Sequence, residues 1–369
     1  MSKATAEGTR RYAQRMSSAV AKGHFHERNG LLVSSIGLGT YLGQWDEHTD
    51  RNYQEAIKRA TELGCNVLDS AINYRFQRSE RAIGAALRET FEAGQLSRDE
   101  IIVATKAGFF PFDGEPPRDP RAWVTENVID KGLARPEEIV GGSHCMTPAY
   151  LEDQLTRSLG NLGLETIDIY YVHNPETQLE AVPRDEFLRR VRAAFEFLER
   201  AAKDGRIGHY GTATWNGYRQ EAGSRGYLSL AEMDSIAREV GGDEHHFRVV
   251  QLPYNLAMPE ALTNANQRVR GEDLSFMMAA DRLGVTVMCS ASMMQARLSQ
   301  NLPPFVGQAL KGLSTDAQRA IQFVRSTPGV TTALVGMSRR SHVDENLAAA
   351  GVPPAPVEEF FSMFSNGEA

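Results

Sequence analysis

One stretch of the sequence, residues 147–173, combines a helix signal with a strand signal: TPAYLEDQLTRSLGNLGLETIDIYYVH. Thr147-Pro148 is typical of an N-cap followed by the first residue of a helix, and leucines recur after it at helical spacing. The run Ile167 to Val172 is apolar almost throughout, as expected for a strand that is buried on both faces. The stretch therefore predicts a helix followed by a buried strand.

Short apolar runs of this kind, rich in valine and isoleucine, recur along the whole chain. Amphipathic helical stripes lie between them, and this alternation with long connections is typical of right-handed βαβ units. Eight runs are what a closed parallel barrel needs, so we predict an α/β fold with a single (β/α)8 TIM barrel; their spacing alone also permits an open sheet. The runs are Ser35–Leu38, Asn66–Leu68, Ile101–Ala104, Ile167–Val172, Ile207–Gly211, Phe247–Leu252, Val285–Met288 and Thr331–Val335.

Two segments lie outside the repeat. Residues 1–23 form an N-terminal extension, followed by a hairpin at His24–Val33 whose Asn29-Gly30 turn would let it close the barrel bottom. Residues 107–146 form a long loop, rich in proline and aromatic residues, for which we expect a packed lid on the C-terminal face of the barrel. We therefore divide the chain into the extension, 1–23, and one barrel domain, 24–369.

Composition excludes several classes of protein. The chain has 369 residues, 41% of them hydrophobic and 24% charged, and 40 basic residues against 47 acidic ones give a formal charge of −7. It has no basic run, which argues against nucleic acid or a membrane surface as a partner. No apolar stretch approaches the roughly 18 residues that span a bilayer. We see no secretory signal at the N-terminus and expect a cytoplasmic protein.

Cysteine and histidine spacing gives no sign of a metal site. Cys65, Cys145 and Cys289 are odd in number and far apart, which excludes a disulfide framework and a zinc ribbon. His245-His246 lies beside acidic residues, but no spacing fixes four ligands on one element, so we expect a solvated loop there.

Polar or ionisable side chains follow three consecutive runs of the predicted barrel. Asp69 follows the second run, with Tyr74 five residues later; Lys106 follows the third run and His173 the fourth. Because the strand C-termini of such barrels carry the reactive groups, the four together predict a proton-transfer site. Taken singly, each also fits a structural role, as half of an ion pair, a packed loop tyrosine or a core histidine.

The chain resembles the aldo-keto reductase family in an ordered set of motifs between about residue 24 and residue 349. These motifs are Gly37-Leu38-Gly39-Thr40, Leu68 to Tyr74, Arg78-Ser79-Glu80, Ala104-Thr105-Lys106, Ile167 to His173, Gly205-Arg206-Ile207, Gln251 with Tyr254-Asn255, and Val335-Gly336 with Glu345-Asn346-Leu347.

The resemblance implies an oxidoreductase that interconverts a carbonyl (of an aldehyde, ketone or sugar) and an alcohol by hydride transfer. Tyr74 would be the general acid and base, its pKa tuned by the ammonium of Lys106, which Asp69 orients. His173 would donate a hydrogen bond to the carbonyl oxygen. The implied cofactor is NADP(H), with NAD(H) as the alternative.

The resemblance also implies a set of binding residues. The nicotinamide end would meet Gly39-Thr40, Thr214 and Gln251, and Cys289-Ser290 stands where the family often has a tyrosine followed by serine. The loop after the last run, with two arginines, suits a phosphate, although His342 replaces a frequent arginine. The full cofactor set is Gly39, Thr40, Thr214, Gln251, Cys289, Ser290, Gly336, Ser338, Arg339, His342, Glu345 and Asn346.

Tyr41 and Trp215 each follow a predicted strand, so we expect them to wall a small-molecule substrate pocket; ordinary packing is the alternative. A rival function is a nicotinamide-nucleotide-binding regulatory or scaffold protein with little turnover, as the potassium-channel β subunits of the family suggest. Assembly into a homo-oligomer through residues 1–23 stays open. The loops 107–146 and 214–228 would choose the substrate.

Overall fold

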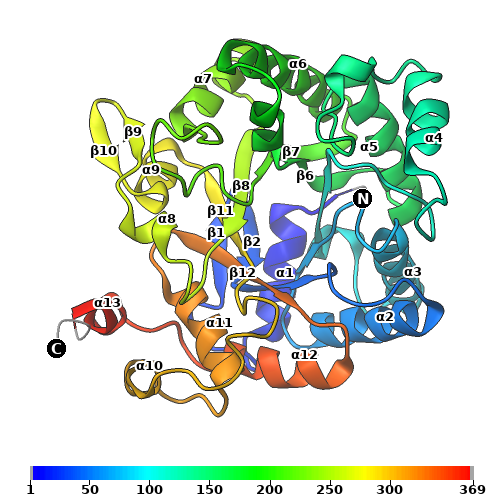
Figure 1. Ribbon diagram of the computed structural model, residues 1–369. Coiled ribbons are helices and arrows are strands. Elements are labelled where there is room, and N and C mark those ends of the chain that lie inside the picture. Colours follow the sequence, from blue (N-terminus) through cyan, green and yellow to red (C-terminus); the bar gives the residue numbers. More distant parts are fainter. Residues whose placement is uncertain (1–2, 366–369) are drawn as a thin grey trace.

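Each of the eight apolar runs forms a strand in the computed structural model, which describes residues 3–365. The strands pair in parallel and close into a barrel in the order β11-β12-β3-β4-β5-β6-β7-β8 (Figure 1), which confirms the predicted closed barrel over the open sheet. The barrel strands are β3 (Ile36–Gly39), β4 (Val67–Asp69), β5 (Ile102–Ala107), β6 (Ile167–His173), β7 (Ile207–Ala213), β8 (Phe247–Pro253), β11 (Thr286–Ser290) and β12 (Val330–Gly336).

Helices surround the barrel (Figure 1). Thr147 caps the helix that its sequence predicts: its side chain accepts the backbone N–H of Tyr150 at 3.3 Å. Among residues 3–365, no helix has the length and apolar character needed to cross a bilayer. Besides one α-helix in the N-terminal extension and one in the loop after β5, the α-helices are α2 (Glu47–Glu62), α3 (Arg78–Glu92), α5 (Pro148–Leu162), α6 (Arg184–Lys203), α7 (Leu230–Gly241), α8 (Glu260–Thr263), α9 (Phe276–Leu283), α10 (Pro304–Ala309), α11 (Asp316–Ser326), α12 (Arg340–Leu347) and α13 (Val357–Ser365).

Strand side chains alternate between two apolar layers. On β6, Tyr170 and Val172 belong to the large cluster shared with the helices, whereas Ile169 and Tyr171 belong to a smaller cluster that fills the barrel. Because both faces are buried, the strands need apolar residues at almost every position. Each large side chain that is fully buried in this way contributes about 1.5–3 kcal/mol to stability.

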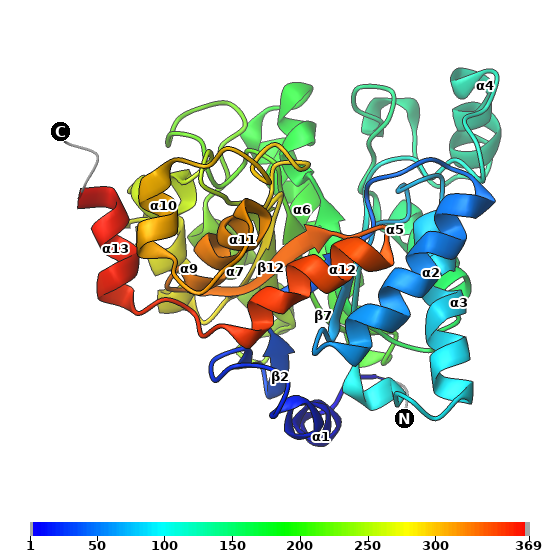
Figure 2. The same ribbon diagram turned by 90° about the horizontal axis from the view of Figure 1, so that it is seen from below.

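The hairpin closes the N-terminal end of the barrel. Strands β1 (Phe25–Arg28) and β2 (Leu31–Ser34) flank the Asn29-Gly30 turn, where both residues have positive φ. Val33 packs into the cluster that fills the barrel. Helix α1 (Ala6–Met16) lies at the same end (Figure 2), and its Arg11 and Arg15 pair with Glu100. The extension therefore packs directly on the barrel, and a domain boundary at residue 23 stays a prediction.

The long loop after β5 is packed, as its aromatic residues predicted. It holds three short helical turns, α4 (Pro120–Val124), a π-turn (Thr125–Ile129) and a 3-10 turn (Pro136–Glu138). Phe110 contacts the rings of Trp123 and Tyr150, with centroids 6.2 and 5.7 Å away. This aromatic cluster gives the loop a small core of its own beside the barrel mouth.

Alanine substitutions at two glycines should have opposite effects on stability. A Cβ on Gly211 of β7 would lie 1.5 Å from the backbone oxygen of Val249, whereas a Cβ on Gly160, exposed in α5, meets nothing within 4 Å. We expect Gly211→Ala to lower the free energy of unfolding by about 2 kcal/mol or more through overpacking. Gly160→Ala should raise it by about 0.5–1 kcal/mol through helix propensity. Urea unfolding of both variants checks this, and equal effects would contradict it.

Candidate active site

Polar side chains from separate strands meet at the C-terminal mouth of the barrel. Asp69 ends β4, Lys106 lies near the end of β5, and His173 ends β6. Gln251 belongs to β8, on the far side of the ring. Tyr74 follows β4 in the loop that leads to α3. Barrel closure therefore brings together the four residues that the sequence singled out, and adds Gln251 to them.

A buried ion pair lies at the centre of this mouth. Lys106 Nζ donates to Asp69 Oδ2 at 2.7 Å and to the backbone oxygen of Ser70 at 2.6 Å, and the two side chains are 0% and 7% exposed. Gln251 Nε2 donates to the other carboxylate oxygen, Oδ1, at 2.7 Å. Burial lowers the pKa of Lys106, and the carboxylate opposes that shift. Removing either partner would leave a charge without compensation in the interior.

Tyr74 lies against this ion pair. Lys106 Nζ is 4.9 Å from the centroid of its ring, and the ring of His173 is 5.8 Å away. Burial, and then the carboxylate of Asp69, raise the pKa of Tyr74 well above its usual value. The phenol therefore keeps its proton at neutral pH, and tuning of its pKa by Lys106 stays a prediction. Tyr74 is placed to give a proton to a ligand at the mouth.

His173 is neutral at the same mouth. Burial, with a smaller contribution from the charge of Lys106, lowers its pKa well below the usual value. Its Nδ1 atom is buried and has no hydrogen-bond partner within residues 3–365, so Nε2 is the nitrogen available to a ligand. The ring of Phe109 meets it edge to face at 5.2 Å. The packing holds an uncharged imidazole, which can donate an N–H to a carbonyl oxygen and so polarise the carbonyl.

A chain of hydrogen bonds behind His173 was not predicted from the sequence. His144, at the end of the long loop after β5, is fully buried and contacts the backbone oxygen of His173 through Nε2 at 2.7 Å. Gln178 Nε2 meets His144 Nδ1 at 2.8 Å, and Arg190 of α6 donates to Gln178 Oε1 at 2.5 Å. Because the carbonyl can only accept, His144 carries its proton on Nε2. These hydrogen bonds connect α6 and the long loop to the end of β6.

The predicted nicotinamide contacts divide into available and unavailable side chains. Thr214 follows β7, and its Oγ1 is buried with no hydrogen-bond partner in the described chain, so a ligand that reached it would supply the missing partner. Ser290 is partly exposed at the end of β11. Thr40 is fully buried and donates to the backbone oxygen of Asp69 at 3.1 Å. Cys289 is also fully buried, in the layer between the strands and the helices, so its side chain points away from the mouth.

The predicted phosphate contacts lie beside them. Gly336 at the end of β12 pairs with Gly39 at the end of β3, so the loop into α12 begins next to the predicted nicotinamide contacts. Ser338 is partly exposed, and Arg339, His342 and Glu345 are exposed, whereas Asn346 is buried. Arg339 is the N-cap of α12. The start of the helix thus offers a hydroxyl, a guanidinium and backbone N–H groups to an anion.

Aromatic side chains wall the mouth more extensively than the sequence indicated. Tyr41 is 56% exposed and lies edge to face with Tyr74, with centroids 4.9 Å apart, and Trp215 is 47% exposed. The additional residues are Trp45, Phe76, Phe112 and Trp123, which we call the aromatic wall; neighbouring rings in it are 5.2, 6.4 and 4.9 Å apart.

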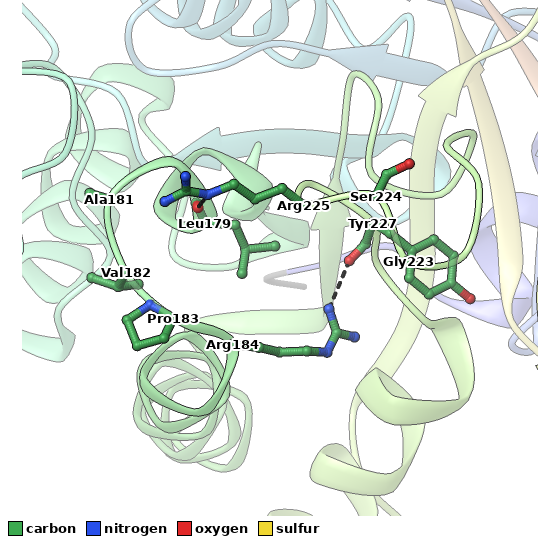
Figure 3. Close-up of a pocket in the computed structure, with 9 residues that line it drawn as sticks. All are labelled: Leu179, Ala181, Val182, Pro183, Arg184, Gly223, Ser224, Arg225 and Tyr227. Atoms are coloured by element: carbon green, nitrogen blue, oxygen red, sulfur yellow. Dashed lines mark hydrogen bonds between the residues drawn. The ribbon is translucent and has the colours of Figure 1, made fainter.

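A cavity of about 700 Å³ lies elsewhere on this face, between the loops that follow β6 and β7 (Figure 3). Arginines bridge its walls: Arg184 Nη1 donates to the backbone oxygen of Tyr227 at 3.0 Å, and Arg225 Nε to that of Leu179 at 2.6 Å. None of the four catalytic candidates lines it. Within residues 3–365, no three His, Cys, Asp or Glu side chains gather as metal ligands would.

Comparison with known proteins gives consistent matches. The model of the aldo/keto reductase family matches residues 35–304. A putative voltage-gated potassium channel subunit beta of Schizosaccharomyces pombe is 25% identical over 339 residues, covering 88% of this chain and 87% of the relative. The NADH-specific methylglyoxal reductase of Escherichia coli is 26% identical over 211 residues, 56% of this chain and 55% of that enzyme.

Solved structures share the fold. A glycerol dehydrogenase from Gluconobacter oxydans superposes with a TM-score of 0.66 at 19% identity, covering 94% of this chain and 95% of that one. An aldo/keto reductase from Klebsiella pneumoniae, in complex with NADP and acetate, gives 0.61 at 18% identity over the same shares.

The neutral state of His144 predicts a pH dependence of stability. Burial lowers its pKa to about 4, whereas in the unfolded chain it is about 6.5. The contribution of neutral His144 to the free energy of unfolding is complete above pH 6.5. It is lost as the pH falls towards 4, because His144 of the unfolded chain then binds a proton that the folded chain does not bind. The wild-type protein loses free energy of unfolding between pH 7 and 4.5, and we expect this loss to be roughly 2–3 kcal/mol smaller in His144→Phe. Urea unfolding at both pH values measures it, with exposed His48→Gln as control; parallel losses in all three proteins would contradict it.

Proposed function

The chain belongs to the aldo/keto reductase family, and we propose that it interconverts a small-molecule carbonyl and an alcohol with NADP(H), using Tyr74 as general acid and base. The observation that carries this proposal is a protonated tyrosine packed against a buried lysine-aspartate pair and a neutral histidine, all at one open barrel mouth. That combination suits proton transfer to an oxygen that gains negative charge.

In the reducing direction, each residue has a separate task. A bound nicotinamide supplies the hydride. His173 donates an N–H to the carbonyl oxygen, and Tyr74 gives its proton to that oxygen as charge develops. The ammonium of Lys106 then stabilises the phenolate, while Asp69 keeps that ammonium charged and oriented. In the oxidising direction, Tyr74 accepts the proton instead.

The residues available for a cofactor fit a nicotinamide dinucleotide. The unpartnered hydroxyl of Thr214 and the partly exposed Ser290 would meet the nicotinamide end. Ser338 and Arg339, at the start of α12, would meet a phosphate. The choice of NADP(H) rests on this basic loop and on the NADP complex from Klebsiella, whereas the E. coli relative is named for NADH.

A second candidate function is nucleotide binding with little turnover, in a regulatory or scaffold role. The observation in its favour is that relatives named as putative or probable voltage-gated potassium channel β subunits match almost the whole chain: the one from Arabidopsis thaliana is 22% identical over 340 residues, 89% of this chain and 90% of that one. Binding of NADPH without oxidation of it by any aldehyde, ketone or ketosugar would favour this candidate.

The proton-transfer roles make a prediction for two variants. We expect Tyr74→Phe and Lys106→Met each to lower kcat by about 100-fold or more, because they remove the proton donor and the charge that stabilises its anion. Loss of NADPH absorbance with a panel of aldehydes, ketones and ketosugars measures this, and NADPH binding should persist in both. The control is Tyr227→Phe, in the separate cavity.

Lys106→Met leaves Asp69 unpaired, so its fold needs an independent check. The double variant Asp69→Asn/Lys106→Met contains no unpaired charge and takes its place if the single variant is unfolded. Wild-type rates in folded Tyr74→Phe and in either lysine variant would sink the proposed roles.

The phosphate assignment makes a prediction about cofactor choice. Removing the guanidinium in Arg339→Gln deletes a charge-assisted contact, so the Kd for NADPH should rise about 10-fold. The Kd for NADH should change much less, because NADH lacks the extra phosphate. Fluorescence titration with both cofactors compares them, with exposed Arg270→Gln as control. Equal weakening for both cofactors would assign Arg339 to a group that they share.

A further inference from the structure

The backbone directly after Tyr74 has an unusual conformation. Arg75, Phe76 and Gln77 have φ values of 48°, 56° and 70°, so three consecutive residues that are not glycine lie in the left-handed region. Glycine is the residue that adopts this region without steric cost. A chain that keeps three larger side chains here must hold them with compensating contacts. We call residues 75–77 the left-handed turn.

Arg75 connects this turn to the loop before α2. Its Nε donates to the backbone oxygen of Gln44 at 2.8 Å, and its Nη2 contacts Asp50 Oδ1 at 2.5 Å. The side chain is 2% exposed, and its guanidinium lies over the ring of Tyr53, 5.1 Å from the centroid. The loop that Arg75 holds, residues 41–46, carries Tyr41 and Trp45 at the mouth.

Gln77 connects the same turn to the long loop after β5. Its Nε2 donates to the backbone oxygen of Pro111 at 3.0 Å, and its Oε1 accepts from Asn161 Nδ2 of α5 at 3.1 Å. Gln77 is 2% exposed. Its amide therefore satisfies a backbone carbonyl of the loop, and α5 fixes its orientation.

Phe76 completes the junction between the two loops. Its ring lies 5.2 Å from that of Trp45 and 6.4 Å from that of Phe112, so it sits between one aromatic side chain of each loop. Its backbone oxygen accepts the N–H of Gly114 at 3.0 Å. Both loops thus meet at the three residues that immediately follow Tyr74.

We propose that Arg75 and Gln77 are positioning residues that hold Tyr74 in place and separately fix the two aromatic loops, 41–46 and 110–115, that form one side of the substrate mouth. Arg75 anchors the first loop and Gln77 the second, and neither touches the reacting groups. The part of this inference that concerns catalysis rests on the proposed function of Tyr74; the anchoring of the loops does not.

Glycine substitutions test the anchors without adding backbone strain. Arg75→Gly and Gln77→Gly each remove one side chain at a position whose φ glycine adopts freely. The matched control is Arg270→Gly, an exposed arginine with φ 52° in the hairpin between β9 (Gln267–Val269) and β10 (Glu272–Leu274). If Arg75→Gly fails to fold, Asp50→Asn weakens the same anchor from α2.

Amide hydrogen exchange of the free protein measures the loops directly. We expect Arg75→Gly to speed exchange at least 10-fold in residues 41–46 while residues 110–115 stay within 2-fold of wild type. Gln77→Gly should give the reverse pattern, and Arg270→Gly should change neither loop. Unchanged exchange in both loops, or equal opening of both in each variant, would overturn the proposal.

Turnover measures the positioning of Tyr74. With a substrate that the wild-type protein turns over, we expect kcat to fall at least 10-fold in Arg75→Gly and Gln77→Gly while the Kd for NADPH changes less than 3-fold. Arg75→Lys, which keeps a cation for Asp50, should recover part of the loss. Loop opening with unchanged kcat would overturn the positioning of Tyr74. An inactive wild-type protein would count against the proposed function alone, since hydrogen exchange still decides the anchoring.

Discussion

The ammonium of Lys106 is buried inside the barrel, and much of the structure follows from compensating its charge. A cation removed from water needs a partner and further hydrogen bonds. Asp69 on the adjacent strand supplies the partner, and Gln251, from β8, binds the other oxygen of the same carboxylate. Three strands that lie far apart in sequence therefore converge on one carboxylate. The closed barrel therefore assembles the mouth, because side chains of β4, β5 and β8 meet only when the strands form a ring.

The two ends of the barrel have different roles. At the N-terminal end, the hairpin and α1 fill and cover the opening with apolar and paired side chains. At the C-terminal end, the connections are long, and the loops after β3, β5, β6 and β7 carry aromatic side chains, buried hydrogen bonds and a cavity. A minimal barrel needs about 250 residues. Most of the additional residues of this chain thus lie in the loops at the end where a small molecule would enter.

The strands, the hairpin and the four residues of the mouth could be predicted because their signals are local. An apolar run with a polar residue at its C-terminal end is visible in a short window, and Asn29-Gly30 is a turn signal by itself. His144, Gln178 and Arg190 gave no such signal, because their contacts arise only when separate loops pack together. Met288 of β11 fills the barrel, so strand alternation turns the next side chain, Cys289, towards the helices, which the motif match alone did not show. Arg75, Phe76 and Gln77 are not residues that favour positive φ, so the local sequence did not predict the left-handed turn.

Burial of the three cysteines makes selective labelling of an added cysteine practical. Cys65, Cys145 and Cys289 are all buried, and burial raises the pKa of each thiol, that of Cys65 to about 11. Thiolate is the form that alkylating reagents attack, so we expect the native thiols to react slowly with them. A single cysteine placed on the exposed surface of the 41–46 or 110–115 loop would therefore accept a spin label or fluorophore selectively, and loop movement could be followed by spectroscopy with all native thiols left in place.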